Sequence, residues 1–224
     1  MNKENLIKGG LILIYAWFCW LMVTITIQYI PINLDVAFLR IKQDYIGFLH
    51  YQIAFFTHVF SAILVLLAGF TQFSKTIRTK YFWAHQWSGW MYVLITLVLA
   101  APSGLILAVY ANGGWSAQIG FSLLAILWFV FTIIAVHKAR QKDIIAHRNW
   151  MWRSFALALS AITLRAWKYI LVALFQPRPM DVYRMVAWLG WVINLVIIEW
   201  IIYKKKVTIQ KREQRGENRD LQQE

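Results

Sequence analysis

The chain has few charged residues, one cysteine and four prolines among its 224 positions. The single cysteine, Cys19, excludes an intrachain disulfide framework, a CxxC redox pair and a thiolate metal cage. Charged residues make up 15% of the sequence and hydrophobic residues 60%. Soluble domains average about a quarter charged and about half apolar residues. The excess apolar surface has to face lipid, so we expect an integral membrane protein.

Acidic residues are scarcer than basic ones, with 10 Asp and Glu against 23 Lys and Arg and a net charge of +13. In a soluble chain this balance would suggest a nucleic-acid partner. In a membrane chain, Lys and Arg instead accumulate on the cytoplasmic side of the spans. The distribution of the charges fits the second explanation, so we expect no nucleic-acid partner.

Long apolar runs dominate the sequence, and six of them reach the roughly 20 residues that a spanning helix needs. They cover residues 10–30, 48–73, 84–110, 115–136, 150–175 and 182–203. The first run follows a basic start, as in a signal peptide, but it is too long and lacks a small-x-small cleavage site, so we expect it to be retained. The predicted fold class is an all-α polytopic membrane protein with six transmembrane helices.

The basic residues in the connectors predict the orientation. Sixteen lie before the first span, between the second and third, between the fourth and fifth, and after the sixth, and only four lie in the other connectors. This bias places both termini in the cytoplasm, for a protein of the bacterial cytoplasmic membrane. We expect one membrane domain over residues 1–203 and a basic tail over residues 204–224 that is disordered. Anionic lipids are the partners that such a basic inner rim attracts.

Ionisable side chains inside a bilayer are costly and usually face the bundle interior or a pathway. All five histidines lie in or at the ends of the second to fifth predicted spans. His85, His137 and His147 fall near the inner face and His50 at the outer edge. His58 lies about 15 Å below the outer end of its helix.

Three of these histidines lie on helical stripes of small and polar residues. Ser154 and Arg165 follow His147 by 7 and 18 residues, which on a straight helix puts Arg165 on the same face about 27 Å away. His85 and His58 begin similar stripes on their own helices. Ordinary packing of membrane helices also uses small residues and hydroxyls, so each stripe has a structural explanation as well.

Imidazole donors without thiolates, and with few carboxylates, suit Zn, Cu or haem iron. Helix bundles hold b-type haem between histidines of facing helices. His85 and His147 are the best candidate pair for such a metal or haem site. Arg148 and Arg153 are placed to bind haem propionates or lipid phosphates.

A second candidate site centres on His58. Arg165 and Lys168 lie at a similar depth in the outer half of the fifth span, where a buried cation needs an anionic partner or water. Glu199 is the one carboxylate well inside a predicted span. Its simplest role is to pair with an inner arginine or histidine.

Two segments, "HQWSGWMY" at residues 85–92 and "HRNWMWRSFALALSAITLR" at residues 147–165, resemble elements of a bacterial membrane family known as domain of unknown function 2306. The segments "HVFSAILVLLAGFTQF" at 58–73 and "VAWLGWVINLVIIE" at 186–199 extend the resemblance from the second to the sixth span. The family resemblance implies a fold and a set of matching residue positions, but it implies no activity. The positions are His58, His85, His147, Arg148, Trp150, Arg153, Arg165, Asn194 and Glu199.

The plan of six helices with histidines is also similar in outline to cytochrome b561 proteins. Those proteins carry histidine pairs at both membrane faces, whereas no outer partner for His58 is evident here. Three functions therefore stay open. The first is a haem or metal redox protein that exchanges electrons with quinone or a redox partner, the second a transporter with a polar pathway near His58 and Arg165, and the third a non-catalytic scaffold or assembly factor.

Overall fold

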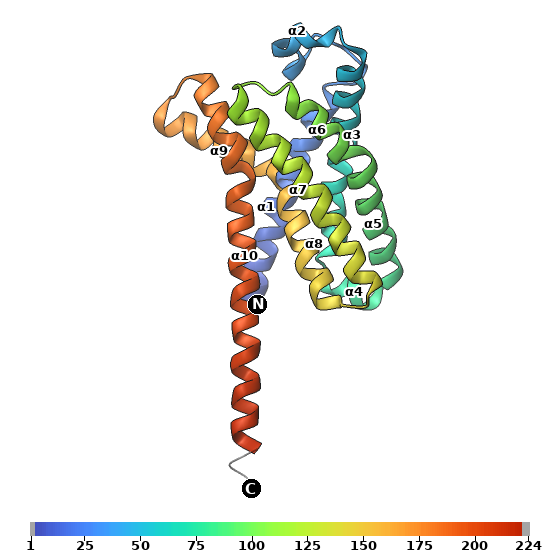
Figure 1. The fold of residues 1–224 in the computed structure, drawn as a ribbon, viewed down its shortest axis with the longest axis vertical. Coiled ribbons are helices and arrows are strands. Elements are labelled where there is room, and N and C mark those ends of the chain that lie inside the picture. Colours follow the sequence, from blue (N-terminus) through green and yellow to red (C-terminus); the bar gives the residue numbers. More distant parts are fainter. Residues whose placement is uncertain (1–2, 221–224) are drawn as a thin grey trace.

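A computed structural model describes residues 3–220, and every regular element in that range is a helix (Figure 1). The elements are α1 (Lys3–Ile27), the 3₁₀-helix η1 (Ala37–Lys42), α2 (Gln43–Ile46), α3 (Leu49–Gln72), α4 (Lys75–Lys80), α5 (Phe82–Leu94), the π-helix η2 (Ile95–Ala100), α6 (Ala101–Val109), α7 (Trp115–Arg140), α8 (Ile144–Ala158), α9 (Ser160–Phe175) and α10 (Pro179–Asp220).

Four of these helical stretches are long and apolar enough to cross a membrane: α3, the continuous run Phe82–Val109, α7 and the first part of α10, Pro179–Lys211. Helices α8 and α9 together form a fifth candidate span, which is bent by 44°. The apolar part of α1, Ile12–Ile27, is shorter. The structure thus confirms the all-α class and a multipass membrane protein with four or five candidate spans.

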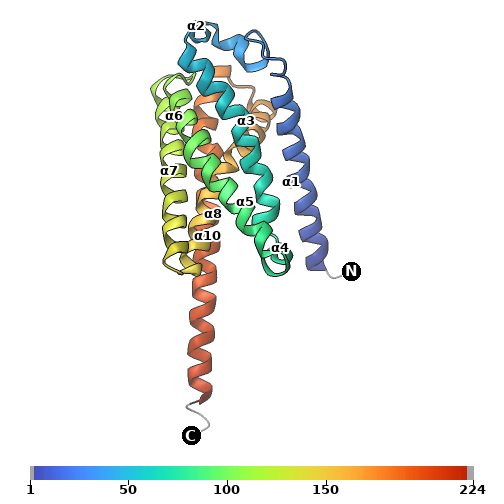
Figure 2. The same cartoon turned by 90° about the vertical axis from the view of Figure 1, so that its right-hand side faces the viewer.

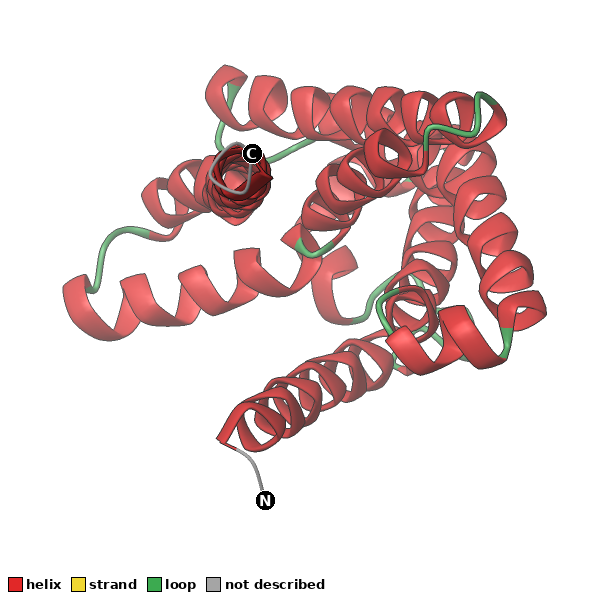
Figure 3. Ribbon diagram, turned by 90° about the horizontal axis from the view of Figure 1, so that it is seen from below, coloured by secondary structure: helices red, strands yellow, loops and turns green. Residues whose placement is uncertain are grey.

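The helices form a bundle with two distinct ends (Figures 1 and 2). One end carries α4, the turn from α7 to α8 and the beginning of α1, and we call it the α4 end. The opposite end carries η1 and α2, and we call it the α2 end. Helix α1 lies at the edge of the bundle against α3, and α10, seen end-on in Figure 3, continues beyond the α4 end on its own.

Large side chains from α5, α7, α8 and α10 fill the centre of the bundle. Tyr92 and Leu157 are fully buried, and Trp128, Phe155 and Trp191 pack around them. Burying side chains of this size is the main apolar contribution to packing between these helices. Tyr92 and Phe155 of this core also line a cavity at the α4 end, so the core supports the walls of that cavity.

The predicted fifth span is not one straight helix, because it breaks between Ala158 and Ser160. The break frees the Ala156 carbonyl, which accepts a hydrogen bond from Asn194 Nδ2 at 3.0 Å. Thr163 reinforces the break, since its hydroxyl bonds to the Leu159 carbonyl at 3.1 Å and accepts from Asn194 at 3.0 Å. The straight stripe predicted from His147 to Arg165 is therefore wrong, since the two residues lie on helices with different axes.

The basic segment after Tyr203, which we expected to be disordered, continues α10 as a helix up to Asp220, and residues 221–224 lie outside the described range. Lys, Arg, Gln and Glu are good helix formers, and no proline follows Pro179. Two lysines also lie over tryptophan rings, Lys204 at 3.9 Å from Trp200 and Lys205 at 3.8 Å from Trp152. These cation–π contacts fix the start of the segment.

At the α2 end, the connector between α1 and α3 is fastened by one buried lysine. The ammonium of Lys42, which is only 2% exposed, donates to the Tyr110 carbonyl and to Asn112 Oδ1. It also lies 5.3 Å from the ring of Tyr45. Desolvation on burial lowers the pKa of Lys42 to about 8, although nearby Asp44 opposes this.

Candidate functional site

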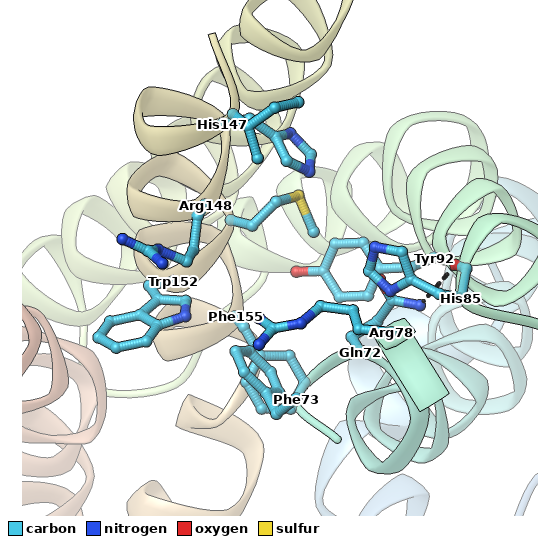
Figure 4. Close-up of a pocket in the computed structure, with 11 residues that line it drawn as sticks. Gln72, Phe73, Arg78, His85, Tyr92, His147, Arg148, Trp152 and Phe155 are labelled. Carbon is cyan, nitrogen blue, oxygen red and sulfur yellow. Dashed lines mark hydrogen bonds between the residues drawn. The ribbon is translucent and has the colours of Figure 1, made fainter. Parts of the chain in front are cut away.

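A cavity of about 200 Å³ lies at the α4 end of the bundle, between α3, α4, α5 and α8 (Figure 4). We call it the histidine cavity. It brings together three of the predicted site residues, His85, His147 and Arg148. The full lining consists of Gln72, Phe73, Arg78, His85, Tyr92, Ile144, His147, Arg148, Met151, Trp152 and Phe155.

His147 is held on the α8 wall by its own helix start and by α7. Asp143 caps α8, since its side chain accepts a hydrogen bond from the Ala146 amide at 3.0 Å. The His147 Nδ1 atom lies 2.8 Å from the Ala135 carbonyl. A carbonyl can only accept, so Nδ1 carries a proton and donates it to Ala135. Within residues 3–220, Nε2 has no hydrogen-bond partner.

His85 stands on the α5 wall, and Gln72 of α3 fixes the turn that carries it. Gln72 Nε2 donates to the His85 carbonyl at 2.9 Å and to Ser88 Oγ at 2.6 Å. Gly89 permits this approach, because a Cβ atom there would lie 3.3 Å from the Gln72 amide oxygen. The His85 Nδ1 atom itself is buried and has no hydrogen-bond partner in the described part of the chain. An unpaired buried polar atom of this kind costs about 1–3 kcal/mol, which a bound ligand can offset.

Two arginines give the cavity a positive charge. Arg78 comes from α4 and Arg148 from α8, and none of the lining residues is acidic. In Figure 4 the Arg78 side chain reaches across the cavity toward Trp152. Guanidinium groups bind phosphates and carboxylates through paired hydrogen bonds. Because no acidic residue in the lining balances the charges of the two arginines, the cavity favours an anionic group.

The rest of the wall is aromatic and continues toward α1. The rings of Phe73 and Phe155 are 4.7 Å apart, and Phe155 in turn lies 6.3 Å from the ring of Tyr15. Tyr15 packs against Phe70 at 4.7 Å. This apolar row leads from the charged cavity toward α1 at the edge of the bundle, an arrangement that fits a ligand with an anionic head and an apolar body.

A chain of hydroxyl groups closes the cavity at its inner end. Tyr92 Oη lies 2.7 Å from Ser154 Oγ, which lies 2.7 Å from Thr132 Oγ1. Thr132 donates to the Trp128 carbonyl at 2.7 Å, and the Trp128 indole donates to Tyr92 Oη at 3.2 Å. Because Thr132 donates to a carbonyl, Ser154 donates to Thr132 and Tyr92 donates to Ser154. The three hydroxyl protons are thus all used inside the core.

Arg153, another predicted site residue, lies outside the lining of the cavity. It forms a two-point ion pair with Glu199, with 2.8 Å between Arg153 Nη2 and Glu199 Oε2, and its guanidinium lies 4.5 Å from the Trp150 ring. The expectation that Glu199 pairs with an inner arginine is confirmed. This pair joins α8 to α10.

His58 and Arg165 lie apart from the cavity, in the half of the bundle nearer the α2 end. His58 Nδ1 bonds to the Ala100 carbonyl at 2.8 Å, where the π-helix meets α6. Gly104 makes room for its ring, since a Cβ atom there would lie 3.0 Å from it. Arg165 donates to the Ala161 carbonyl of its own helix, and Lys168 is exposed.

His85 and His147, the predicted pair, share the histidine cavity, and His58, predicted as a separate second site, lies apart from it. No group of three or more His, Cys, Asp or Glu residues within the described range has an arrangement that could hold a metal ion. The other two histidines have simple partners. His50 bonds to the Tyr110 hydroxyl at 2.6 Å, and the exposed His137 bonds to Gln141 at 2.9 Å.

Sequence reasoning did not assign Arg78 or Trp152 to the site. The sequence marks Arg78 only as one of the basic connector residues that predict topology, because it lies outside the long apolar runs. Helical spacing from His85 could not have found it, because α4 ends at Lys80 and the chain turns at Tyr81 before α5 begins. Trp152 follows Arg148 by four residues, one turn along α8, and this helical spacing is the signal in the sequence that places the two side chains on one face.

Together, the long apolar helices and the cationic cavity define a multipass α-helical membrane protein with a lined cavity at one end of its bundle. The family described as "Predicted membrane protein (DUF2306)" matches residues 55–202, and the chain belongs to this family. No curated protein and no solved structure matches the chain, so the outline similarity to cytochrome b561 proteins has no support.

Proposed function

We propose that the protein is a six-span protein of the bacterial cytoplasmic membrane, with both termini in the cytoplasm, that binds an anionic amphiphile in the histidine cavity. The beginning of α1 and the end of α10 lie on the α4 side of the bundle, which agrees with an even number of crossings (Figure 1). The excess of basic residues on that side supports a cytoplasmic α4 end. In this arrangement α1 is the remaining span.

One observation carries the binding function: two arginines enter a cavity whose lining contains no acid. Placing two cations together near a membrane is unfavourable unless an anion or water compensates them. Pockets for drug-sized ligands have volumes of roughly 300–1,000 Å³. The histidine cavity, at about 200 Å³, suits a head group, while the ring row of Phe73 and Phe155 accommodates an apolar tail.

The direct test is lipid binding to the full chain purified in mild detergent, measured by native mass spectrometry. Anionic lipid should bind more tightly than zwitterionic lipid, and the double variant Arg78→Gln/Arg148→Gln should bind about tenfold more weakly. The matched control, Arg140→Gln/Lys206→Gln, removes two exposed charges outside the histidine cavity. Equal losses in both double variants would argue for a general surface effect and against a site, leaving the scaffold interpretation.

A second candidate function is binding of b-type haem for membrane electron transfer. The observation in its favour is His147, whose Nδ1 is held by the Ala135 carbonyl as metal-bound histidines usually are. The cavity of about 200 Å³ does not fit a haem as it stands, and His85 Nδ1 has no anchoring partner in the described chain. An optical spectrum with metal analysis tests for haem. A colourless, metal-free protein purified from haem-replete cells would exclude this candidate function.

A further inference from the structure

A third cation lies beside the histidine cavity, outside its lining. The ammonium of Lys205 on α10 lies 3.8 Å from the centre of the Trp152 ring, and Trp152 itself lines the cavity. This ammonium is also close enough to Arg148 and Arg78 for the charges of the two guanidinium groups to act on it. Cations from three helices, α4, α8 and α10, therefore gather at this end of the bundle.

We infer that these three residues, Arg78, Arg148 and Lys205, select a diphosphate head group over a head group with a single negative charge. We call the three residues the cation cluster. The inference rests on the proposed function, because it presupposes that an anionic group enters the cavity. It adds the chemical class of that group, and it adds Lys205 to the site.

No acidic side chain that the structure describes compensates the cation cluster. None of the ion pairs between described side chains includes a member of the cluster. Glu199, on the same helix as Lys205, binds Arg153 with both carboxylate oxygens. Asp143, which precedes α8, caps that helix by accepting a hydrogen bond from the Ala146 amide. The charge of the cluster is thus left for a ligand.

A diphosphate matches the cation cluster better than a phosphodiester does. A guanidinium group binds a phosphate through a pair of hydrogen bonds, and a lysine binds one as a point charge. A diphosphate can present a separate phosphate group to each of Arg78 and Arg148, and its larger charge also attracts Lys205. A phosphodiester head group has one charged phosphate, which leaves most of the positive charge of the cluster uncompensated.

The exposure of the cation cluster sets the size of the expected preference. All three side chains are exposed to solvent, so water weakens each contact with the anion. The additional ion pairs that a diphosphate makes should therefore strengthen its binding by about tenfold in all. Because no residue that lines the cavity is acidic, no carboxylate there holds Mg²⁺ against the phosphates, so this binding should not require Mg²⁺.

The test compares two lipids with the same short acyl chains, dioctanoylglycerol diphosphate and dioctanoyl phosphatidylglycerol. Binding to the full-length protein in a non-ionic detergent is measured by calorimetry near pH 7, with EDTA present. The diphosphate lipid should bind about tenfold more tightly. Equal or weaker binding of the diphosphate lipid overturns the inference and leaves the proposed function standing, whereas binding of neither lipid overturns the proposed function as well.

The variant Lys205→Gln tests whether the third cation belongs to the site. It should weaken binding of the diphosphate lipid by about fivefold, whereas Lys205→Arg keeps the charge and should keep the affinity. The matched control is Lys204→Gln, which removes the neighbouring exposed lysine, whose ammonium lies over Trp200 instead. Equal losses in Lys205→Gln and Lys204→Gln would mean that the preference reflects the net charge of the protein, and would contradict the cluster.

Inorganic pyrophosphate, added as a competitor, distinguishes a lipid head group from a free anion. Displacement of the diphosphate lipid only at concentrations far above the Kd of that lipid supports an amphiphilic ligand. If pyrophosphate binds as tightly as the lipid, the amphiphile in the proposed function is wrong and the diphosphate chemistry is retained. Sulfate should compete more weakly than pyrophosphate, and equal competition by the two anions would overturn the inference.

Discussion

The Nδ1 atom of His147 lies 2.8 Å from the carbonyl oxygen of Ala135, which ties the first turn of α8 to the last turns of α7 at the edge of the cavity. This contact fixes a proton on the Nδ1 atom of the ring. It also fixes which nitrogen faces the cavity. A side chain that was one of five histidines in the sequence thereby acquires a definite chemical role.

Replacing His147 with alanine removes part of the wall of the histidine cavity, so it should weaken binding of anionic lipid by about tenfold and change stability little. The Ala135 carbonyl lies within α7, so its helical bond is retained when the imidazole is lost. Native mass spectrometry and a thermal melt in detergent measure the two effects separately. His137→Ala is the control, because His137 is exposed and bonds only to Gln141. A variant that melts much earlier and binds normally would make His147 a structural residue.

The hydroxyl chain below the cavity should respond to the loss of a single oxygen. Thr132→Val keeps the shape of the side chain, but Ser154 then donates to no acceptor, so we expect the free energy of unfolding to fall by about 1 kcal/mol. Unfolding in mixed detergent micelles measures the loss. Thr208→Val, which removes an exposed hydroxyl on α10, should lie within about 0.5 kcal/mol of the parent. Similar losses of stability in both variants would mean that the chain of hydroxyl groups does not stabilise the protein.

The helices and their approximate ends could be predicted from the sequence, because long apolar runs leave no other structure in lipid. The break at Leu159 could not be predicted, because no proline or glycine marks it. The Ala156 carbonyl beside the break accepts its hydrogen bond from Asn194, which lies far along the chain. The pairing of His85 with His147 across one cavity followed from depth alone. Arg78 was missed, because its role depends on how α4 folds back under α5.

The contact between α3 and α6 should be sensitive to one methyl group at Gly104. A Cβ atom there would lie 3.0 Å from the His58 ring, which is itself held by the Ala100 carbonyl. We expect Gly104→Ala to cost about 1–3 kcal/mol through overpacking, detected as a lower melting temperature. Gly10→Ala is the matched control, since a Cβ atom at that position meets nothing within 4 Å. An unchanged melting temperature in Gly104→Ala would contradict the tight fit around His58.

The buried ammonium of Lys42 should make the α2 end more stable at alkaline pH. Its pKa is about 8 in the folded protein and 10.5 ordinarily, so between these values the unfolded chain binds more protons than the folded chain. The free energy of opening should therefore rise as the pH increases from about 8 to about 10.5, by about 3 kcal/mol in all, and stay flat below pH 8. The neutral amine still donates to the Tyr110 carbonyl and Asn112, so the contact survives deprotonation. Hydrogen exchange of η1, compared between the parent and Lys42→Met, measures the rise. Parallel pH profiles in the two proteins would show that another group titrates.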